Sequence, residues 1–196
     1  MARIEAEPKP ESREIVGKNG MVLRRFAPYQ AEAIHFLIQS DPDHLNANHQ
    51  HIAEKYPTVE SVLKSIEQPK NPERRRFGIW PGALMVGSVN IEPELGAPVP
   101  TAEVGYWIAK KYEGQGFVSR AMRSLVAFAF DELGTERLIA KVATNNARSG
   151  RLVGKLGFRL ALIGWEQDEF TSEKYKSKTY ELWRHQPDHY PPVRVE

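Results

Sequence analysis

A predicted strand, Ala102–Ile108, runs through a glycine-bearing turn into a predicted long helix, Gly116–Leu133, and this succession most constrains the fold. Apolar residues recur at spacings of three and four along the helical part, which predicts one continuous buried stripe. Gly134 follows directly, in the place where a glycine commonly ends a helix. A strand joined to a buried helix in this way favours a sheet covered by helices.

The other segments complete a mixed α/β pattern. Pro81-Gly82 separates two apolar runs and predicts a β-hairpin. The whole order is strand, helix, helix, hairpin, strand, helix, strand, helix, strand, strand, which predicts an α/β (α+β) fold with a central mixed sheet. The remaining predicted elements are Met21–Phe26, Pro28–Gln39, a helix opening at Pro57-Thr58, Phe77–Trp80, Leu84–Ile91, Arg137–Ala143, Asn146–Leu156, Leu160–Trp165 and Thr179–Trp183.

The length of 196 residues predicts one domain. We expect this domain to span residues 21–185, between a loose N-terminal tail, 1–20, and a Pro-rich C-terminal tail, 186–196. The formal net charge is only +2 and both signs are scattered, so neither nucleic acid nor a membrane surface is an expected partner.

The chain contains no cysteine, which excludes disulfides, thiolate metal sites and a covalent thiol nucleophile, and suits a reducing compartment. The stretch Met1–Asn19 has acidic residues and lacks an apolar run, so it resembles neither a secretory signal nor a mitochondrial presequence. No segment approaches the ~20 apolar residues that a membrane span requires. We therefore expect a cytoplasmic protein.

The turn before the long helix carries the chemistry. Small residues let the backbone approach a ligand, and the unpaired amides at a helix start favour an anion, so Glu113–Val118 predicts a phosphate or pyrophosphate cradle. A P-loop is excluded because Phe117-Val118 follows Gly116, where Lys-Ser/Thr is required. The dinucleotide-binding fingerprint needs a third small residue where Ser119 stands and an acidic residue at the end of the next strand. The acidic residues Asp131 and Glu132 instead lie in the predicted helix, which argues against this fingerprint. Alone, the Gly-Gln-Gly triplet is equally compatible with an ordinary tight turn.

With its flanks, this region resembles the GCN5-related N-acetyltransferase (GNAT) superfamily, and within it the RimJ/RimL-like ribosomal-protein acetyltransferases, over Met21–Arg184. The family motif Gln/Arg-x-x-Gly-x-Gly/Ala falls on Glu113–Val118, with Glu113 and Val118 as departures. A second match is Asn146-Ala147-Arg148-Ser149 followed by Gly154-Lys155-Leu156-Gly157-Phe158.

The resemblance implies binding of acetyl-coenzyme A as co-substrate, without a metal. The sheet would splay between the strands Ala102–Ile108 and Arg137–Ala143, with the pantetheine arm between them and the thioester near Ile108. The resemblance places Asn146 and Ser149 beside the pantetheine. The full set of cofactor-binding residues that it implies is Ile108, Glu113, Gly114, Gln115, Gly116, Phe117, Val118, Ser119, Asn146 and Ser149.

An amine attacks a carbonyl only when unprotonated, so a base is useful. The resemblance suggests Glu103 as this base, acting directly or through water, and Ser149 as the group that protonates the departing thiolate. A solvated glutamate and a capping serine remain alternatives, and capping alone also explains Asn146. Without a covalent intermediate, we expect direct transfer in a ternary complex.

His44, His49 and His51 raise the question of a metal. In sequence they lack a thiolate or a nearby carboxylate partner, so we expect them to line the acceptor groove or lie in solvent.

The acceptor would bind against the first two helices and the loops Ser40–Tyr56 and Glu166–Lys178. The resemblance favours the N-terminal α-amine of a protein, while a small-molecule amine, a peptide or an antibiotic remains open. Two further alternatives are a non-catalytic CoA-binding module and a nucleotide-binding protein. We expect a monomer or a homodimer.

Overall fold

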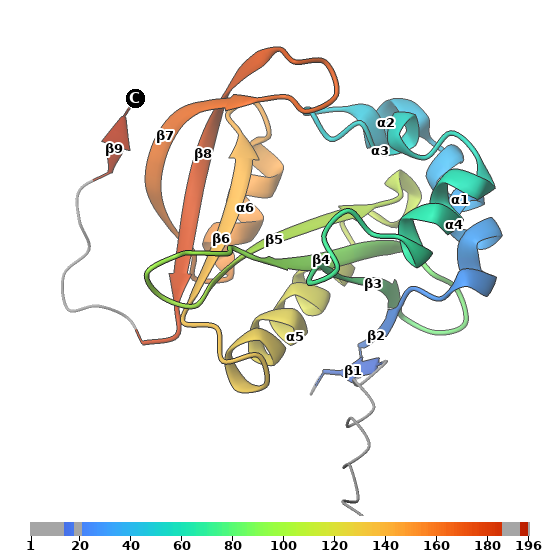
Figure 1. The fold of residues 1–196 in the computed structure, drawn as a ribbon, viewed down its shortest axis with the longest axis horizontal. Helices are drawn as coiled ribbons and strands as arrows, with labels where there is room; N and C mark the ends of the chain where they lie inside the picture. Colours follow the sequence, from blue (N-terminus) through green and yellow to red (C-terminus); the bar gives the residue numbers. More distant parts are fainter. Residues whose placement is uncertain (1–13, 18–20, 186–192, 196) are drawn as a thin grey trace, which may run out of the picture.

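The computed structural model describes residues 14–17, 21–185 and 193–195. Nine strands form one sheet in the order β1-β2-β3-β4-β5-β6-β8-β7-β9 (Figure 1). Neighbouring strands are antiparallel except for the pairs β5–β6 and β7–β9, which are parallel. The strands are β1 Glu14–Val16, β2 Val22–Arg25, β3 Arg75–Trp80, β4 Gly87–Pro93, β5 Thr101–Ile108, β6 Arg137–Ala143, β7 Arg159–Gln167, β8 Lys174–Trp183 and β9 Arg194–Val195.

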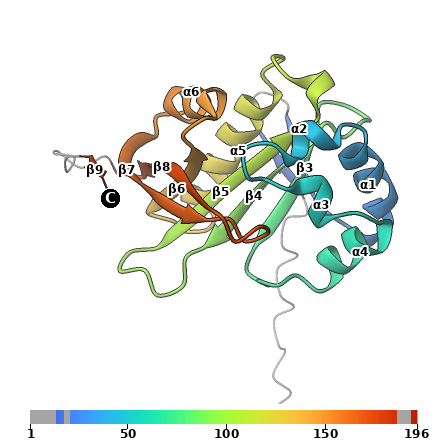
Figure 2. The ribbon, with the colours of Figure 1, turned by 90° about the horizontal axis from the view of Figure 1, so that it is seen from above.

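Helices pack on the sheet in two groups (Figure 2). The long helix α5 and the following α6 belong to a core built with β2–β6, whereas α1 and α4 form a second core. Alternation along β5 joins the two cores, because Val104 lies in the first and Trp107 in the second. The α-helices are α1 Ala31–Gln39, α2 Pro42–Asn46, α3 Ile52–Lys55, α4 Val59–Glu67, α5 Phe117–Asp131 and α6 Ala147–Lys155, with 3₁₀ turns at Pro28–Gln30 and Lys110–Tyr112.

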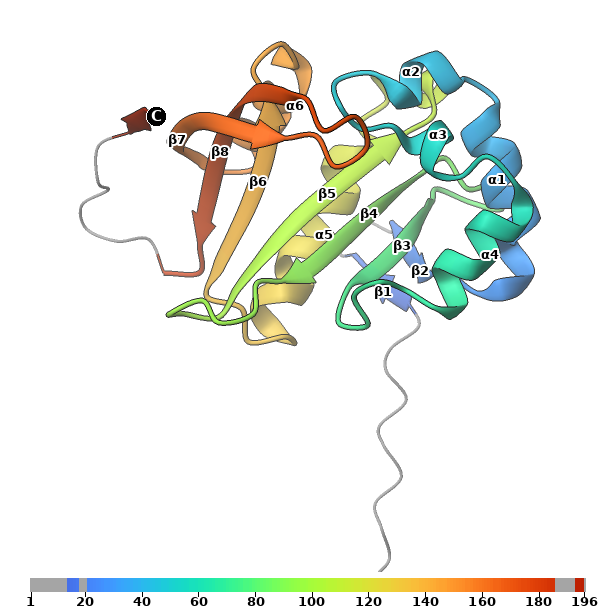
Figure 3. The same cartoon turned by 45° about the horizontal axis from the view of Figure 1, so that its top comes forward.

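The sheet opens between β5 and β6 (Figure 3). The two strands pair only at Thr101, Ala102 and Glu103, and the later residues of β5 pair with β4 alone. Beyond that point β6 continues as the partner of β8. The predicted splay is thus confirmed, and it opens toward the end of β5 that leads into the glycine turn.

Several local predictions are corrected. The hairpin's second strand begins at Gly87, since Leu84 is 69% exposed in the connecting bend. A β-carbon on Gly87 would lie 2.3 Å from the Trp107 carbonyl oxygen, so this strand start requires glycine. The last of the predicted strands, β8, begins at Lys174 and not at Thr179.

Short elements also form in segments that were predicted to be irregular. The polar segment Ser40–Tyr56 contains α2 and α3, whose four or five residues are too few for a periodic signal. Within the predicted tails, β1 pairs with β2 and β9 pairs with β7. Residues 1–13, 18–20, 186–192 and 196 of the two tails lie outside the described ranges.

Among the described residues, no helix is both long and apolar enough to cross a membrane.

Candidate active site

A cavity of about 970 Å³ lies where β5 and β6 separate. Its walls come from four places in the chain: the end of β5, the turn into α5, the first turns of α6, and the segment around α2. The lining residues are His44, Leu45, Asn48, Gln50, Tyr106, Trp107, Ile108, Tyr112, Glu113, Gly114, Gly116, Phe117, Val118, Ser119, Arg123, Asn145, Asn146, Ala147, Arg148, Ser149, Arg151, Leu152 and Lys155.

The turn Glu113–Ser119 forms one end of this cavity. Gly114 and Gly116 have φ angles of 74° and 76°, a left-handed conformation that disfavours any side chain. Gly116 caps α5, and the Arg120 amide donates back to its carbonyl at 3.1 Å. The backbone N–H groups of Phe117, Val118 and Ser119 lie in the first turn of α5, where the helix itself offers them no acceptor. This arrangement suits an anion, as the sequence predicted.

Gln115 differs from its neighbours in the predicted cradle. It does not line the cavity, and its side-chain amide donates to the Lys111 carbonyl at 3.2 Å. Any contribution of Gln115 to the cradle would therefore come from its backbone.

The charged residues of the cavity wall are predominantly basic. Arg123, Arg148, Arg151 and Lys155 all line it, and Glu113 is the one acidic residue in the described lining. Glu113 forms an ion pair with Arg148 and lies 3.6 Å from the His44 imidazole. The wall therefore carries a positive excess that favours a polyanionic ligand.

Asn146 and Ser149 lie together at the start of α6. The Asn146 side chain accepts the backbone N–H of Ser149 at 3.1 Å, so Asn146 caps this helix. Both residues also line the cavity, so the cap leaves the Ser149 hydroxyl available for another partner.

Tyr106 is a candidate that neither sequence motif indicated. Its hydroxyl donates to the Ser149 carbonyl at 3.5 Å, and burial raises the pKa of Tyr106. It therefore remains a neutral proton donor beside Ser149 at neutral pH. Side chains alternate along a strand, so Tyr106 lies on the face opposite Glu103 and Trp107, toward the core that contains the long helix.

Glu103 does not line the cavity. Its side chain is 49% exposed and lies 3.6 Å from the Lys141 ammonium, which also contacts Glu166 at 3.4 Å. Burial raises the pKa of Glu103, Lys141 opposes this, and the nearby carboxylates Glu166 and Glu92 add to the rise. The structure thus places Glu103 in a charged group apart from Ser149, where β5 and β6 still pair.

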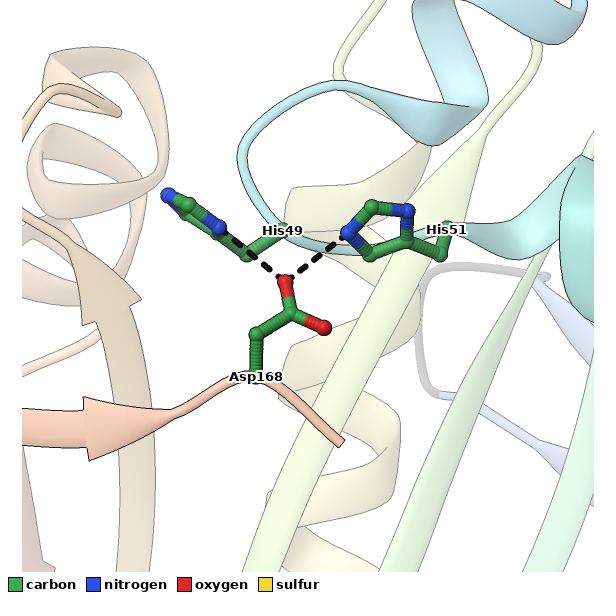
Figure 4. Close-up of side chains that lie close together, drawn as sticks. All are labelled: His49, His51 and Asp168. Carbon is green, nitrogen blue, oxygen red and sulfur yellow. Dashed lines mark hydrogen bonds and ion pairs between the residues drawn. The ribbon is translucent and has the colours of Figure 1, made fainter. Parts of the chain in front are cut away.

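The three histidines separate into two environments. His44 lines the cavity, where its Nε2 lies 3.1 Å from the Ile108 carbonyl. His49 and His51 instead meet Asp168, which follows β7 (Figure 4). The expectation that these histidines have no nearby carboxylate partner is wrong, since His51 also contacts Glu54, three residues along the chain, and the fold brings Asp168 to both histidines.

Asp168 is the buried centre of this second environment. Burial alone would raise its pKa, but the backbone N–H groups of Thr171 and Phe170 and the two imidazoles hold it far below the usual range. Burial lowers the pKa of His51, whereas hydrogen bonds to Glu54 and Asp168 raise it, and the net shift is upward.

Solved acetyltransferase structures share this architecture. A microcin self-immunity acetyltransferase in complex with acetyl-CoA and AMP superposes with a TM-score of 0.74 at 20% identity, covering 83% of this chain and 92% of that protein. RimL, a ribosomal alpha-N-protein acetyltransferase in complex with coenzyme A, gives 0.73 at 17% identity, covering 87% and 97%. The predicted fold class, a splayed mixed sheet flanked by helices, is confirmed.

The sequence itself then identifies the family. Residues 20–159 match the model of the acetyltransferase (GNAT) domain, so the chain belongs to the GNAT acetyltransferase family. A curated relative, the probable N-acetyltransferase YjcK of Bacillus subtilis, is 33% identical over 112 residues. This match covers 54% of the present chain and 62% of YjcK. The resemblance inferred from the two motifs is confirmed.

Proposed function

We propose that this protein transfers an acetyl group from acetyl-CoA to a primary amine. The observation that supports this most strongly is the cavity between the separated strands β5 and β6, which ends at the amides of α5 and has basic walls. A thioester-bearing arm fits the space between the strands, and the diphosphate of coenzyme A fits the helix start. GNAT membership and the acetyl-CoA-bound relative support the same co-substrate.

The cavity suggests a division of roles among the residues expected to hold the co-substrate. Gly114, Gly116, Phe117, Val118 and Ser119 would bind the diphosphate through backbone amides, with Gln115 contributing its amide only. Ile108, Asn146 and Ser149 would lie along the pantetheine arm. Glu113 would orient Arg148 and not contact a phosphate itself, because two anions repel.

In the proposed reaction the amine nitrogen attacks the acetyl carbonyl carbon, and the carbon–sulfur bond breaks as coenzyme A leaves. The ammonium formed on attack gives up a proton, and the thiolate takes one. We assign proton donation to the hydroxyls of Ser149 and Tyr106, because both residues line the cavity and the Tyr106 hydroxyl contacts the Ser149 backbone carbonyl.

Glu103 remains our candidate for the base. Because it lies outside the cavity lining, it would act through water. A backbone N–H near the end of β5 would meet the developing oxyanion.

The acceptor we favour is the N-terminal α-amine of a protein, since RimL is described as an alpha-N-protein acetyltransferase. The acceptor surface would include the segment 40–56 and the β7–β8 connection, which meet at Asp168. Cytoplasmic location and a monomeric or homodimeric state stay predictions.

Two experiments test the proposal. In a thermal-shift comparison, acetyl-CoA and CoA should stabilise the protein, while ATP and NAD should not. An acceptor screen with peptides bearing free α-amines, matched peptides with blocked α-amines, and small amines should then reveal transfer. Stabilisation by CoA without transfer to any amine would support a binding module, and ping-pong kinetics would exclude direct transfer.

A further inference from the structure

Two histidines and a buried aspartate converge from segments distant in sequence. His49 and His51 lie in the connection between α2 and α3, and Asp168 follows β7. The two contacts with Asp168 span 119 and 117 residues. Such a meeting point depends wholly on the tertiary fold, and it lies outside the cavity assigned to the co-substrate.

The donor atoms are grouped closely enough for a metal ion to bind all three. Asp168 Oδ2 lies 3.1 Å from His49 Nδ1 and 2.8 Å from His51 Nε2, and all three atoms lie within 4.8 Å of one another (Figure 4). Ligand atoms bound tetrahedrally to zinc at 2.0–2.1 Å are about 3.3 Å apart. The two separations from Asp168 Oδ2 are a few tenths of an ångström shorter than this, and the two imidazole nitrogens, which lie within 4.8 Å of each other, would have to approach to about the same spacing when the ion binds.

The outer contacts hold these donors in place. Asp168 Oδ1 accepts the backbone N–H groups of Phe170 and Thr171 at 2.8 and 3.1 Å, which directs Oδ2 toward the histidines. His51 Nδ1 lies 2.5 Å from Glu54 Oε2. A carboxylate behind a histidine is the usual means of fixing the tautomer of a metal ligand.

His51 lies between two carboxylates. Both of its ring nitrogens face carboxylate oxygens, but a neutral imidazole carries one proton. With that proton directed at Glu54, the lone pair of Nε2 faces Asp168 Oδ2. A second proton on His51, a proton on Glu54 or a metal ion would each satisfy these contacts, and the geometry favours the metal because His49 directs a third donor to the same place.

The local backbone is held in a rarely occupied conformation. Asn48, His49 and His51 have φ angles of 56°, 63° and 49°. Non-glycine residues remain in this region when surrounding interactions determine it, and such residues gather at ligand sites. The His49 ring also stacks on Tyr175, with 4.0 Å between the centroids.

We propose that His49 Nδ1, His51 Nε2 and Asp168 Oδ2 bind a zinc ion that ties the α2–α3 connection to the β7–β8 connection. Two imidazoles and one carboxylate form a donor set that suits zinc, and three protein ligands leave a fourth position for water. Glu54 is the carboxylate near His51 in sequence, and the fold adds Asp168, which contacts both histidines.

The ion would shape the neighbouring cavity. Residues alternate along this connection, because Asn48 and Gln50 line the cavity while His49 and His51 face Asp168. Fixing the two histidines would fix the two cavity-lining residues between and beside them. The proposal does not depend on acetyl transfer, since zinc binding is measured directly.

The test uses the full chain, freed of any affinity tag and stripped with a chelator. Titration calorimetry with zinc chloride should give one site, and the thermal midpoint should rise with zinc concentration. Cobalt(II) added in place of zinc should give the visible absorption of a tetrahedral site. The His49→Asn, His51→Asn and Asp168→Asn variants should each lose these signals, at least tenfold in affinity.

Two control variants test whether zinc binding depends on these three residues or on any histidine or carboxylate at the surface. His35→Asn removes a histidine that contacts only the Pro57 carbonyl among its described hydrogen bonds, and Glu169→Gln removes the adjacent exposed acid. Both should bind zinc like the unaltered chain. Circular dichroism must confirm that the Asn variants fold. If Asp168→Asn does not fold, the loss of zinc binding in His51→Asn is a sufficient test.

Absence of stoichiometric zinc or cobalt binding by the folded, stripped chain would overturn the proposal. A thermal midpoint that rises as the pH falls, unaffected by zinc, would also overturn it and assign the second proton to His51. Equal loss of binding in the two controls would show that the ion is held at the surface without these three ligands.

Discussion

Arg148, in the first turn of α6, forms an ion pair with Glu113, in the turn that leads into α5, so the pair joins two walls of one cavity. Glu113 occupies a motif position where the family has Gln or Arg. A carboxylate beside a diphosphate site is unfavourable unless a cation neutralises it. The pairing explains how the departure is compatible with binding a polyanion.

Replacing Arg148 by Ala should weaken acetyl-CoA binding roughly 10- to 100-fold, since a charge-assisted hydrogen bond contributes about 1.5–3 kcal/mol and Glu113 would also remain unneutralised. Titration calorimetry measures the change, with the exposed Lys64→Ala in α4 as control. In the Glu113→Gln/Arg148→Ala double variant the loss should be smaller. An equal loss of acetyl-CoA affinity in the single and double variants would show that Glu113 does not repel the bound co-substrate.

Glu103→Gln should lower kcat by roughly 10²–10⁴, the usual contribution of a general base. Because the pKa of Glu103 is raised above 4.5, kcat of the unaltered enzyme should fall as the pH falls through that raised value, where the base becomes protonated. The pH profile of kcat should lose this acid limb in the variant. An unchanged profile would remove Glu103 from the mechanism.

Lys141→Met should move that acid limb to higher pH. The Lys141 ammonium lies 3.6 Å from Glu103 and lowers its pKa, so its removal leaves burial and the other carboxylates unopposed. The same pH series, run beside Lys64→Met, measures the shift. A limb that moves to lower pH, or not at all, would mean that a different group titrates.

Asn146→Ala should lower the free energy of unfolding by about 1 kcal/mol, because it removes the cap of α6. Ser149→Ala keeps the capping bond, which uses the Ser149 backbone N–H, and should change stability less while lowering kcat. Urea unfolding and steady-state kinetics separate the two effects. If Ser149→Ala left kcat unchanged, the hydroxyl would have no role in transfer.

Gly116→Ala should lower the free energy of unfolding by about 1–2 kcal/mol, since its φ of 76° is a left-handed conformation. An added β-carbon would also lie 3.2 Å from the Arg120 guanidinium. Gly154→Ala in α6 meets nothing within 4 Å and should instead stabilise by about 0.5–1 kcal/mol. Denaturant melts of the two variants should therefore move in opposite directions.

The sequence by itself determined the features that depend on neighbours a few residues apart. The apolar period predicted α5, and the glycine turn and the Asn146 cap involve contacts within one helical turn. The two motifs placed the chain in its family for the same reason, because their spacing is written directly in the chain. Short polar helices such as α2 and α3 could not be predicted in this way, since one turn carries no period.

Only the tertiary structure decided which distant groups meet. The ion pair between Glu113 and Arg148, the separation of Glu103 from the cavity, and the convergence of His49 on Asp168 all depend on how strands and loops pack. The last contact joins residues 119 positions apart, and no local preference encodes such a distance. Long-range contacts arise when burial of the whole core selects one arrangement, so their chemistry becomes visible only in the fold.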